Sequence, residues 1–292
     1  MYAVQIGKLD EATLALKQRE STKRELVNLI DNRIPVVLEE IGRLLREALI
    51  ILSGSADVGS SPKSTSAATL VITSPNNDAV KGFLTVNGTS IVKGDLTIKF
   101  NHYNRGSPYK VTVNNSKPHS LLQLHLARNG VVAATGIVED SFFAGFDRIS
   151  LMQMFKRISN QIGQSIQILK AAPEDTLFPA RDCDAKMFAP DLPEDLIVEF
   201  HVAETSVVCS IFAIQFHRDA LPIQIQQLQH KFLTRFRGSL KTSMYKGRHV
   251  EILDELAVES VSPQLTRLEA ILARIQTICQ STHHKLACVS EI

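Results

Sequence analysis

The sequence has no run of about 18 apolar residues, the length that a helix needs to cross a lipid bilayer. A membrane-spanning segment is therefore not expected. The first twenty residues scatter charges through what would be the apolar core of a secretory signal, so we expect no signal peptide. The four cysteines show no paired spacing, which favours a reducing compartment over a disulfide framework. A cytoplasmic protein is therefore predicted.

A net charge of one sign is also missing, because 32 basic side chains are balanced by 30 acidic ones. The net charge of +2 excludes a strong overall field that would attract nucleic acid or an anionic membrane. Such a partner would require a local patch. The hydrophobic fraction of 44% is typical of a folded protein, and 292 residues suffice for two packed units.

Catalytic and nucleotide-binding motifs are missing as well. The sequence has no GxGxxG, GxSxG or HExxH. The glycine spacing from Gly54 to Ser61 is similar to that of a phosphate-binding loop, but the lysine of that motif is absent. We therefore predict that the protein is not an enzyme and has no cofactor.

Two clusters of chemically active side chains have structural interpretations. Cys279, His283, His284 and Cys288 form the densest set of metal-ligand types, but on one helix Cys288 lies nearly half a turn from Cys279. No metal site is therefore predicted. A weaker hypothesis is a hydrolase that uses His125, His201 or the carboxylates of the DLPEDL segment. The favoured interpretation is that these side chains are solvated and have no catalytic role. Those carboxylates are Asp191, Glu194 and Asp195.

Heptad patterns predict three helical segments, at residues 26–52, 146–170 and 258–286. Each apolar stripe covers about three positions in seven, which suits a helical bundle better than a two-stranded zipper. Pro35 predicts a kink or restart near residues 31–34. The structural seam is assigned to Ile30, Ile34, Val37, Ile41, Leu44, Leu265, Leu268, Leu272 and Ile275.

Period-two alternation predicts strands between residues 68 and 139, read as an antiparallel meander. Asn87-Gly88 and Asn129-Gly130 are typical of hairpin turns, because both residues of such a turn tolerate positive φ. Two later segments, DLIVEFHV and VVCSIFAIQF, are expected to join the same sheet.

These patterns predict an α+β fold, in which N-terminal, middle and C-terminal helices form an antiparallel helical bundle with an inserted antiparallel β-sheet domain. The protein is expected to be a monomer outside any complex, because the broad stripes close on one another. The bundle is assigned to residues 1–53, 141–172 and 250–292, the β domain to 68–140 and 190–217, a flexible loop to 54–67 and a basic connecting region to 218–249.

The basic connecting region has no acidic residue between Asp219 and Glu251. A solvated face, a docking surface for an acidic protein, and a lipid or RNA surface all remain open. The alternative function is therefore a nucleic-acid- or membrane-binding module, whose binding would fall steeply with salt. The candidate partner-binding residues are Lys231, Arg235, Arg237, Lys241, Lys246 and Arg248.

Four stretches of the sequence resemble the Rogdi family. Residues 187–202, MFAPDLPEDLIVEFHV, carry an MFAP-x-LP-x-DL pattern, and residues 80–86, VKGFLTV, are similar to a family hairpin strand. VESVSP and the leucine heptad that follows it, through residue 280, resemble the C-terminal helix. RELVNLID and EEIGRLLREA resemble the first helix. The likeness extends over about residues 24–286.

The resemblance implies a two-part molecule, with an α domain made from both chain ends and the middle, and an inserted β domain. Rogdi is the small subunit of RAVE-type complexes, and no family motif is catalytic. The implied role is to work with a large WD-repeat, rabconnectin-type subunit in returning the peripheral sector of the V-ATPase to its membrane sector. The implied partners are that subunit and the V-ATPase peripheral-sector subunits, with peripheral recruitment to vacuolar or endosomal membranes and no small-molecule substrate.

Overall fold

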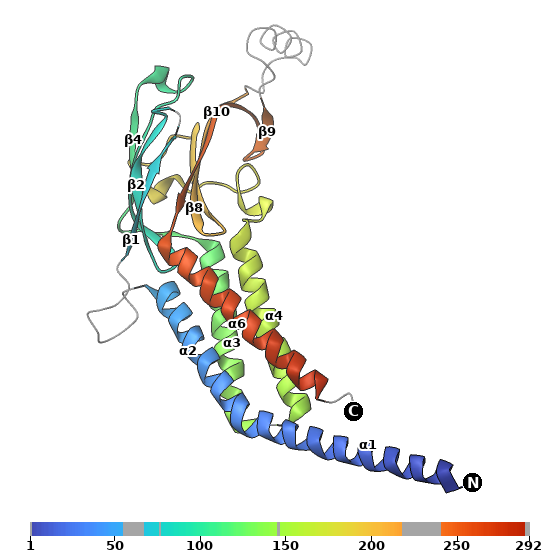
Figure 1. Cartoon of the computed structure of the whole chain (residues 1–292). Coiled ribbons are helices and arrows are strands. Elements are labelled where there is room, and N and C mark those ends of the chain that lie inside the picture. The colour runs from blue at the N-terminus through green and yellow to red at the C-terminus, as the bar shows by residue number, and fades with distance from the viewer. Residues whose placement is uncertain (1, 55–66, 76, 145–146, 218–240, 290–292) are drawn as a thin grey trace. The chain divides into compact units, whose positions relative to one another are not determined.

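The computed structural model describes residues 2–54, 67–75, 77–144, 147–217 and 241–289, which fall into two compact units (Figure 1). The helical unit comprises Met1–Ile50, Ala127–Gln167 and Leu268–Ile292. The β unit comprises Ile51–Leu126 and Ile168–Arg267. Each unit is therefore built from segments that are distant in the sequence.

Five long helices lie in the described ranges, and most of their residues belong to the helical unit. Their buried faces carry aliphatic and aromatic side chains such as Leu45, Phe155 and Leu272, which exclude water from the core. Arg274 on one helix donates to Glu40 on another across 2.6 Å. The helices are α1 (Tyr2–Asn28), α2 (Ile34–Ser53), α3 (Leu122–Ala144), α4 (Arg148–Lys170) and α6 (Pro263–Cys288).

Local signals in the sequence explain where α4 and α6 begin. The carboxylate of Asp147 accepts hydrogen bonds from the backbone N–H groups of Ile149 and Ser150, at 2.9 and 3.0 Å, and these bonds help to lower its pKa. Ser262 precedes α6, and Pro263 occupies its first position, where a missing N–H costs nothing. The start of α4 agrees with the predicted middle helix.

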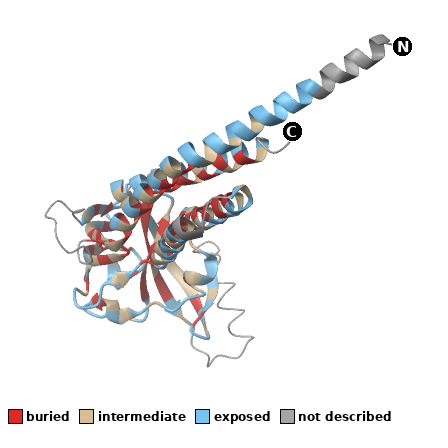
Figure 2. Ribbon diagram, turned by 90° about the horizontal axis from the view of Figure 1, so that it is seen from below, coloured by how far each residue is buried: buried red, intermediate tan, exposed pale blue. Residues whose placement is uncertain are grey.

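The first helix changes character at the position predicted from Pro35. Leu29–Arg33 form a π-helical turn, in which the backbone N–H of Ile34 donates to the carbonyl of Leu29. Helix α1 precedes this turn, and its described side chains from Thr13 to Ser21 are all exposed (Figure 2). Helix α2 follows it with a buried face. The interruption is therefore present, and in the described part of this segment the buried side chains begin at Ile34, directly after it.

The predicted helical bundle with one inserted sheet is wrong. The chain has a mixed architecture, in which the N-terminal helical segment is followed by strands and the C-terminal segment is a helix. An antiparallel bundle arrangement is not evident among the described helices. The heptad pattern identifies the buried face of each helix, but it carries no information about which element covers that face. The bundle prediction assumes that the helices cover one another, which the pattern alone does not establish.

Residues 122–144 form helix α3, so the hairpin predicted at Asn129-Gly130 is wrong. Leu124 is buried, whereas its period-two neighbours Leu122 and Leu126 are 44% and 42% exposed, which is helical rather than strand periodicity. Gly130 serves helix packing, because a side chain there would overlap Ser165 of α4. The close contact between α3 and α4 therefore explains the glycine at position 130, which the sequence pattern assigns to a turn.

The described residues of the β unit form two antiparallel sheets, whereas one sheet is predicted from the sequence. In the first sheet, the hairpin predicted at Asn87-Gly88 is confirmed between β2 and β3. Its strand order is β1-β2-β3-β4-β6, with β5 beside β3. The strands are β1 (Ala68–Thr73), β2 (Val80–Asn87), β3 (Ser90–Ile98), β4 (Tyr109–Val113), β5 (His119–Ser120) and β6 (Phe188–Ala189).

The second sheet has the order β7-β8-β10-β9. The segments DLIVEFHV and VVCSIFAIQF supply β7 and β8 here, and residues 258–261, predicted as helical, belong to β10. The two sheets face each other in Figure 1, and the rings of Phe188 and Phe200 lie 6.2 Å apart between them. The strands are β7 (Leu196–Ala203), β8 (Ser206–Phe216), β9 (Thr242–Tyr245) and β10 (Arg248–Val261).

Polar side chains join parts of the β unit that are distant in sequence. His102 donates its backbone N–H to Asp254 at 3.0 Å, and its Nδ1 lies 3.0 Å from the other carboxylate oxygen. Gln123 lies at the start of α3, and its amide bonds backbone groups of Ile168 and Val202. These contacts tie the first sheet to β10, and α3 to β7.

Candidate partner-binding surfaces

The structure describes half of the basic residues assigned to partner binding. Lys241 donates to the carboxylate of Glu255 across 2.7 Å. Lys246 occupies the β9–β10 turn with a φ of 50°, and its Nζ lies 5.2 Å from the centre of the Tyr245 ring. The three remaining residues, Lys231, Arg235 and Arg237, lie outside the described part of the chain.

Arg248 is the third described member of this set, and it has two contacts within the β unit. Its guanidinium lies 3.2 Å from a carboxylate oxygen of Glu194. It also lies 3.8 Å from the centre of the Phe216 ring, a distance at which a cation is attracted to the ring face. All three described basic residues thus contact groups of their own chain. A binding role for the stretch stays a prediction.

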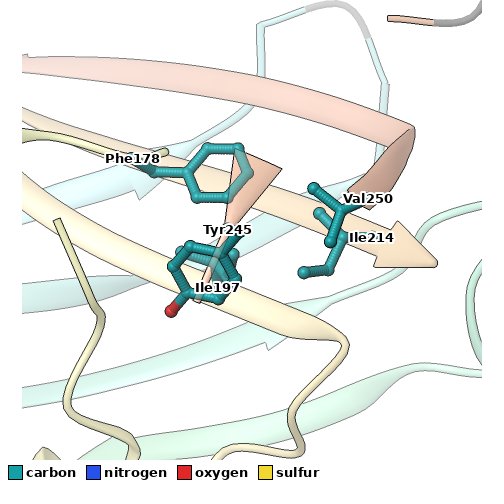
Figure 3. Close-up of a cluster of buried hydrophobic side chains, with 5 residues drawn as sticks. All are labelled: Phe178, Ile197, Ile214, Tyr245 and Val250. Carbon is teal, nitrogen blue, oxygen red and sulfur yellow. The ribbon is translucent and has the colours of Figure 1, made fainter. Parts of the chain in front are cut away.

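A cluster of buried apolar side chains packs the β9–β10 hairpin against its neighbours in the second sheet (Figure 3). The ring of Phe178 contacts this cluster, with its centre 5.2 Å from that of Tyr245 and 4.6 Å from that of Phe212. The hydroxyl of Tyr245 accepts a hydrogen bond from the backbone N–H of Cys183 at 3.0 Å. The hairpin that carries Lys246 and Arg248 is therefore anchored by a packed core. The cluster is Phe178, Ile197, Ile214, Tyr245 and Val250.

Most of the residues assigned to the heptad seam are buried. The two half-buried ones are Ile30 and Val37, which lie close to the π-helical turn. Because the others are covered, the seam contributes to the interior and presents little surface to a second chain. The buried ones are Ile34, Ile41, Leu44, Leu265, Leu268, Leu272 and Ile275.

The side chains considered for metal binding do not converge. Cys279 is buried in α6, and burial raises the pKa of its thiol to about 12. Farther along the helix, His284 Nε2 lies 3.5 Å from Cys288 Sγ, and both residues belong to one exposed turn. Within the described ranges, no group of three or more His, Cys, Asp or Glu side chains is arranged to hold a metal ion.

The side chains considered for hydrolysis lie in separate places. His125 is in α3, with Nε2 3.1 Å from the hydroxyl of Thr89, and His201 is in β7. Asp195 accepts a hydrogen bond of 3.4 Å from the hydroxyl of Tyr103. Glu194 pairs with Arg248, as described above. Cys183 donates to the carbonyl of Val198 at 3.2 Å, and burial raises the pKa of its thiol, which disfavours the nucleophilic thiolate.

His119 is a partly buried titratable group that the sequence patterns did not reveal. Its ring meets that of Phe200 edge to face with centres 5.1 Å apart, and its Nδ1 is buried without a hydrogen-bond partner. Burial is the main cause that lowers the pKa of His119 to about 4, the positive charge of Arg181 acts in the same direction, and Asp184 opposes both. The imidazole is therefore neutral in the folded protein at neutral pH.

This depressed pKa predicts a loss of stability in mild acid. The unfolded chain binds a proton at His119 near pH 6.5, whereas the folded chain binds it only near pH 4. The neutral imidazole therefore contributes fully to the free energy of unfolding above pH 6.5, and this contribution falls as the pH drops below that value. We expect wild type to lose about 1 to 2 kcal/mol more than His119→Leu between pH 7 and 5. Urea titrations at both pH values measure this difference, and equal losses in the two proteins would refute it.

The outer side of the first sheet is an exposed surface that was not anticipated. Val71 on β1 is 67% exposed and pairs directly with half-buried Phe83 on β2, which pairs in turn with Asp95 on β3. Three exposed lysines of β2, β3 and β4 share this side. We call this surface the lysine face, and define it by Val71, Lys81, Phe83, Lys93, Asp95 and Lys110.

Together these features define the class of protein. It is a two-unit helix-and-sheet protein whose candidate sites, among the described residues, are surfaces rather than a catalytic cluster. Each helix in the described ranges is too short or too polar to span a lipid bilayer.

Comparison with known sequences then gives the family. The chain belongs to the family described as Rogdi leucine zipper containing protein, whose model matches residues 25–287. It is similar to two proteins that are both named protein rogdi homolog. The one from Pongo abelii is 23% identical and the one from Homo sapiens 22% identical, each over 287 residues and 94% of both chains. The resemblance inferred from four stretches is confirmed, and neither name is that of an enzyme.

Proposed function

We propose that this protein is a non-catalytic adaptor subunit of a complex that promotes reassociation of the peripheral and membrane sectors of the V-ATPase. The observation that carries the proposal is the family match over residues 25–287, nearly the whole chain. The role is the one that the Rogdi resemblance implies. The adaptor would act in the cytoplasm, and it would be recruited peripherally to vacuolar or endosomal membranes.

The partners in this proposal are a large WD-repeat, rabconnectin-type subunit and the peripheral-sector subunits of the V-ATPase. The chemistry of the described residues supports a binding role. Buried thiols have raised pKa values, and the acidic residues Glu194 and Glu255 are engaged in ion pairs. The described residues also leave broad surfaces exposed, including the lysine face and the side chains of α1 from Thr13 to Ser21.

Co-purification tests the proposal directly. Tagged full-length protein, expressed at its natural level, is expected to enrich both the WD-repeat subunit and V-ATPase peripheral subunits over an unrelated tagged protein. Quantitative mass spectrometry measures the enrichment. If neither partner rises above that control, the adaptor role is wrong.

Loss of the protein is expected to change the assembly of the V-ATPase and leave the amount of its subunits unchanged. Cells lacking it should keep normal amounts of V-ATPase subunits, but the membrane-bound fraction of the peripheral sector should fall, and organelle pH should rise. Cell fractionation and a ratiometric pH probe measure these changes, and wild-type protein should restore both. Unchanged fractionation in the deleted cells would contradict the proposed role.

A further inference from the structure

The lysine face combines apolar and basic side chains on one open sheet surface. Val71 and Phe83 are direct cross-strand neighbours, so their side chains lie in contact range and form one small apolar area. Val71 is 67% exposed, although a β-branched residue in the middle of a strand is commonly covered. The pair therefore exposes apolar surface to water, and a bound partner would cover that surface.

Lysines surround this apolar pair on the same side of the sheet. Lys81 and Lys110 lie in the neighbouring row of the ladder, joined through Thr97, and Lys93 lies on the other side of the pair. The Nζ of Lys93 is 5.8 Å from the centre of the Phe83 ring, and Lys81 pairs with Asp78 across 2.7 Å. An apolar centre with a charged rim is the usual anatomy of a protein interface.

The charges of the face indicate the partner's chemistry. The three lysines of the face outnumber Asp95 and Asp78, the partner of Lys81, so the surface is complementary to acidic side chains. Asp95 pairs directly with Phe83, at the centre of the face, where it would repel the phosphate groups of a nucleic acid whose base stacked on that ring. Single-stranded nucleic acid is bound through several stacked aromatics, whereas Phe83 stands alone on this surface. A protein is therefore favoured over RNA or a lipid headgroup.

We propose that the lysine face docks an acidic protein surface, whose carboxylates meet Lys81, Lys93 and Lys110 while an apolar side chain covers Val71 and Phe83. The identity of that partner rests on the proposed adaptor function. The chemistry of the contact is inferred from the side chains of the lysine face.

Site-specific photo-crosslinking tests this contact in cells with the full-length protein. Val71 is replaced by the photo-reactive p-benzoyl-phenylalanine, and the same replacement at Val132, a 51% exposed valine of α3, is the matched control. We expect Val71, but not Val132, to trap a protein whose crosslinked peptide is rich in Asp and Glu. Crosslinks only to RNA or lipid, or the same products from both positions, would overturn the proposal.

Charge reversal provides the second arm. Lys93→Glu with Lys110→Glu is expected to reduce the crosslink from position 71 at least tenfold, because two attractive contacts become repulsive. The control carries the same change of charge at exposed positions of α4, Lys156→Glu with Arg157→Glu, and should keep the crosslink. Thermal unfolding checks that both variants fold. An unchanged crosslink in the first variant would overturn the proposal.

The trapped protein also separates this inference from the proposed function. If it is the WD-repeat subunit or a V-ATPase peripheral subunit, both are supported. A different acidic protein supports the docking face and counts against the proposed function. If position 71 traps no protein while wild type still co-purifies with the V-ATPase subunits, the docking face is wrong and the adaptor role stands.

Discussion

Gln123→Leu is expected to lower the free energy of unfolding by about 3 to 5 kcal/mol. The side-chain amide of Gln123 donates to the carbonyls of Ile168 and Val202, at 2.7 and 2.8 Å, and accepts from the N–H of Val202 at 2.7 Å. Gln123 is 5% exposed. Leucine would fill the space but leave these backbone groups without partners, away from water.

Chemical denaturation monitored by circular dichroism measures this loss. The matched control is Gln164→Leu, the same change at an exposed position of α4, which should shift the free energy of unfolding by less than about 0.5 kcal/mol. Similar small shifts in both variants would show that water replaces the lost amide. The hydrogen bonds of Gln123 would then contribute little to stability.

Gly82→Ala is expected to destabilise the protein by at least about 3 kcal/mol. A Cβ at Gly82 in β2 would overlap the backbone carbonyl oxygen of Asp95 and lie 2.9 Å from the Cα of Leu96, both in β3. These atoms belong to the paired strand, so relief would require the two strands to separate. A single methyl group would therefore disturb the ladder beneath the lysine face.

The same substitution elsewhere should have the opposite sign. Gly136 lies in the middle of α3, and a Cβ there would meet no atom within 4 Å. Gly136→Ala is therefore expected to raise the free energy of unfolding by about 0.5 to 1 kcal/mol, because alanine is the better helix former. Urea denaturation of the two variants side by side measures both effects. Two changes of the same sign would contradict the steric explanation.

The periodicity of the sequence predicts local structure well where one face alone is buried. The middle helix was recognised because Leu151, Phe155 and Ile158 repeat at helical spacing, and all three are buried. The hairpin at Asn87-Gly88 was recognised from its turn residues. The segment at 122–144 was misread because Leu122, Leu124 and Leu126 alternate, although only Leu124 is buried. On the helix, Leu122 and Leu126 lie on one side and Leu124 on the opposite side, a difference that alternation in the sequence does not reveal.

The surfaces were harder to predict than the elements. Leu70, Val71 and Ile72 form a continuous apolar run, which is typical of a strand covered on both sides, yet Val71 is 67% exposed. The number of sheets could not be read either, because pairing between distant strands leaves no local pattern. The contact of His102 with Asp254, 152 residues apart, shows the difficulty. Such pairs depend on the assembled fold, and periodicity describes only neighbours.

The π-helical turn at Leu29–Arg33 changes what a partner helix would encounter along the N-terminal rod. The extra residue in such a turn rotates the following side chains by about 100° relative to those before it. A helix that followed one stripe of α1 would therefore lose contact with the same stripe beyond Ile34. The rod consequently has two phases, of which its own chain covers the second. The first phase, on α1, is exposed at its described side chains from Leu14 to Ser21.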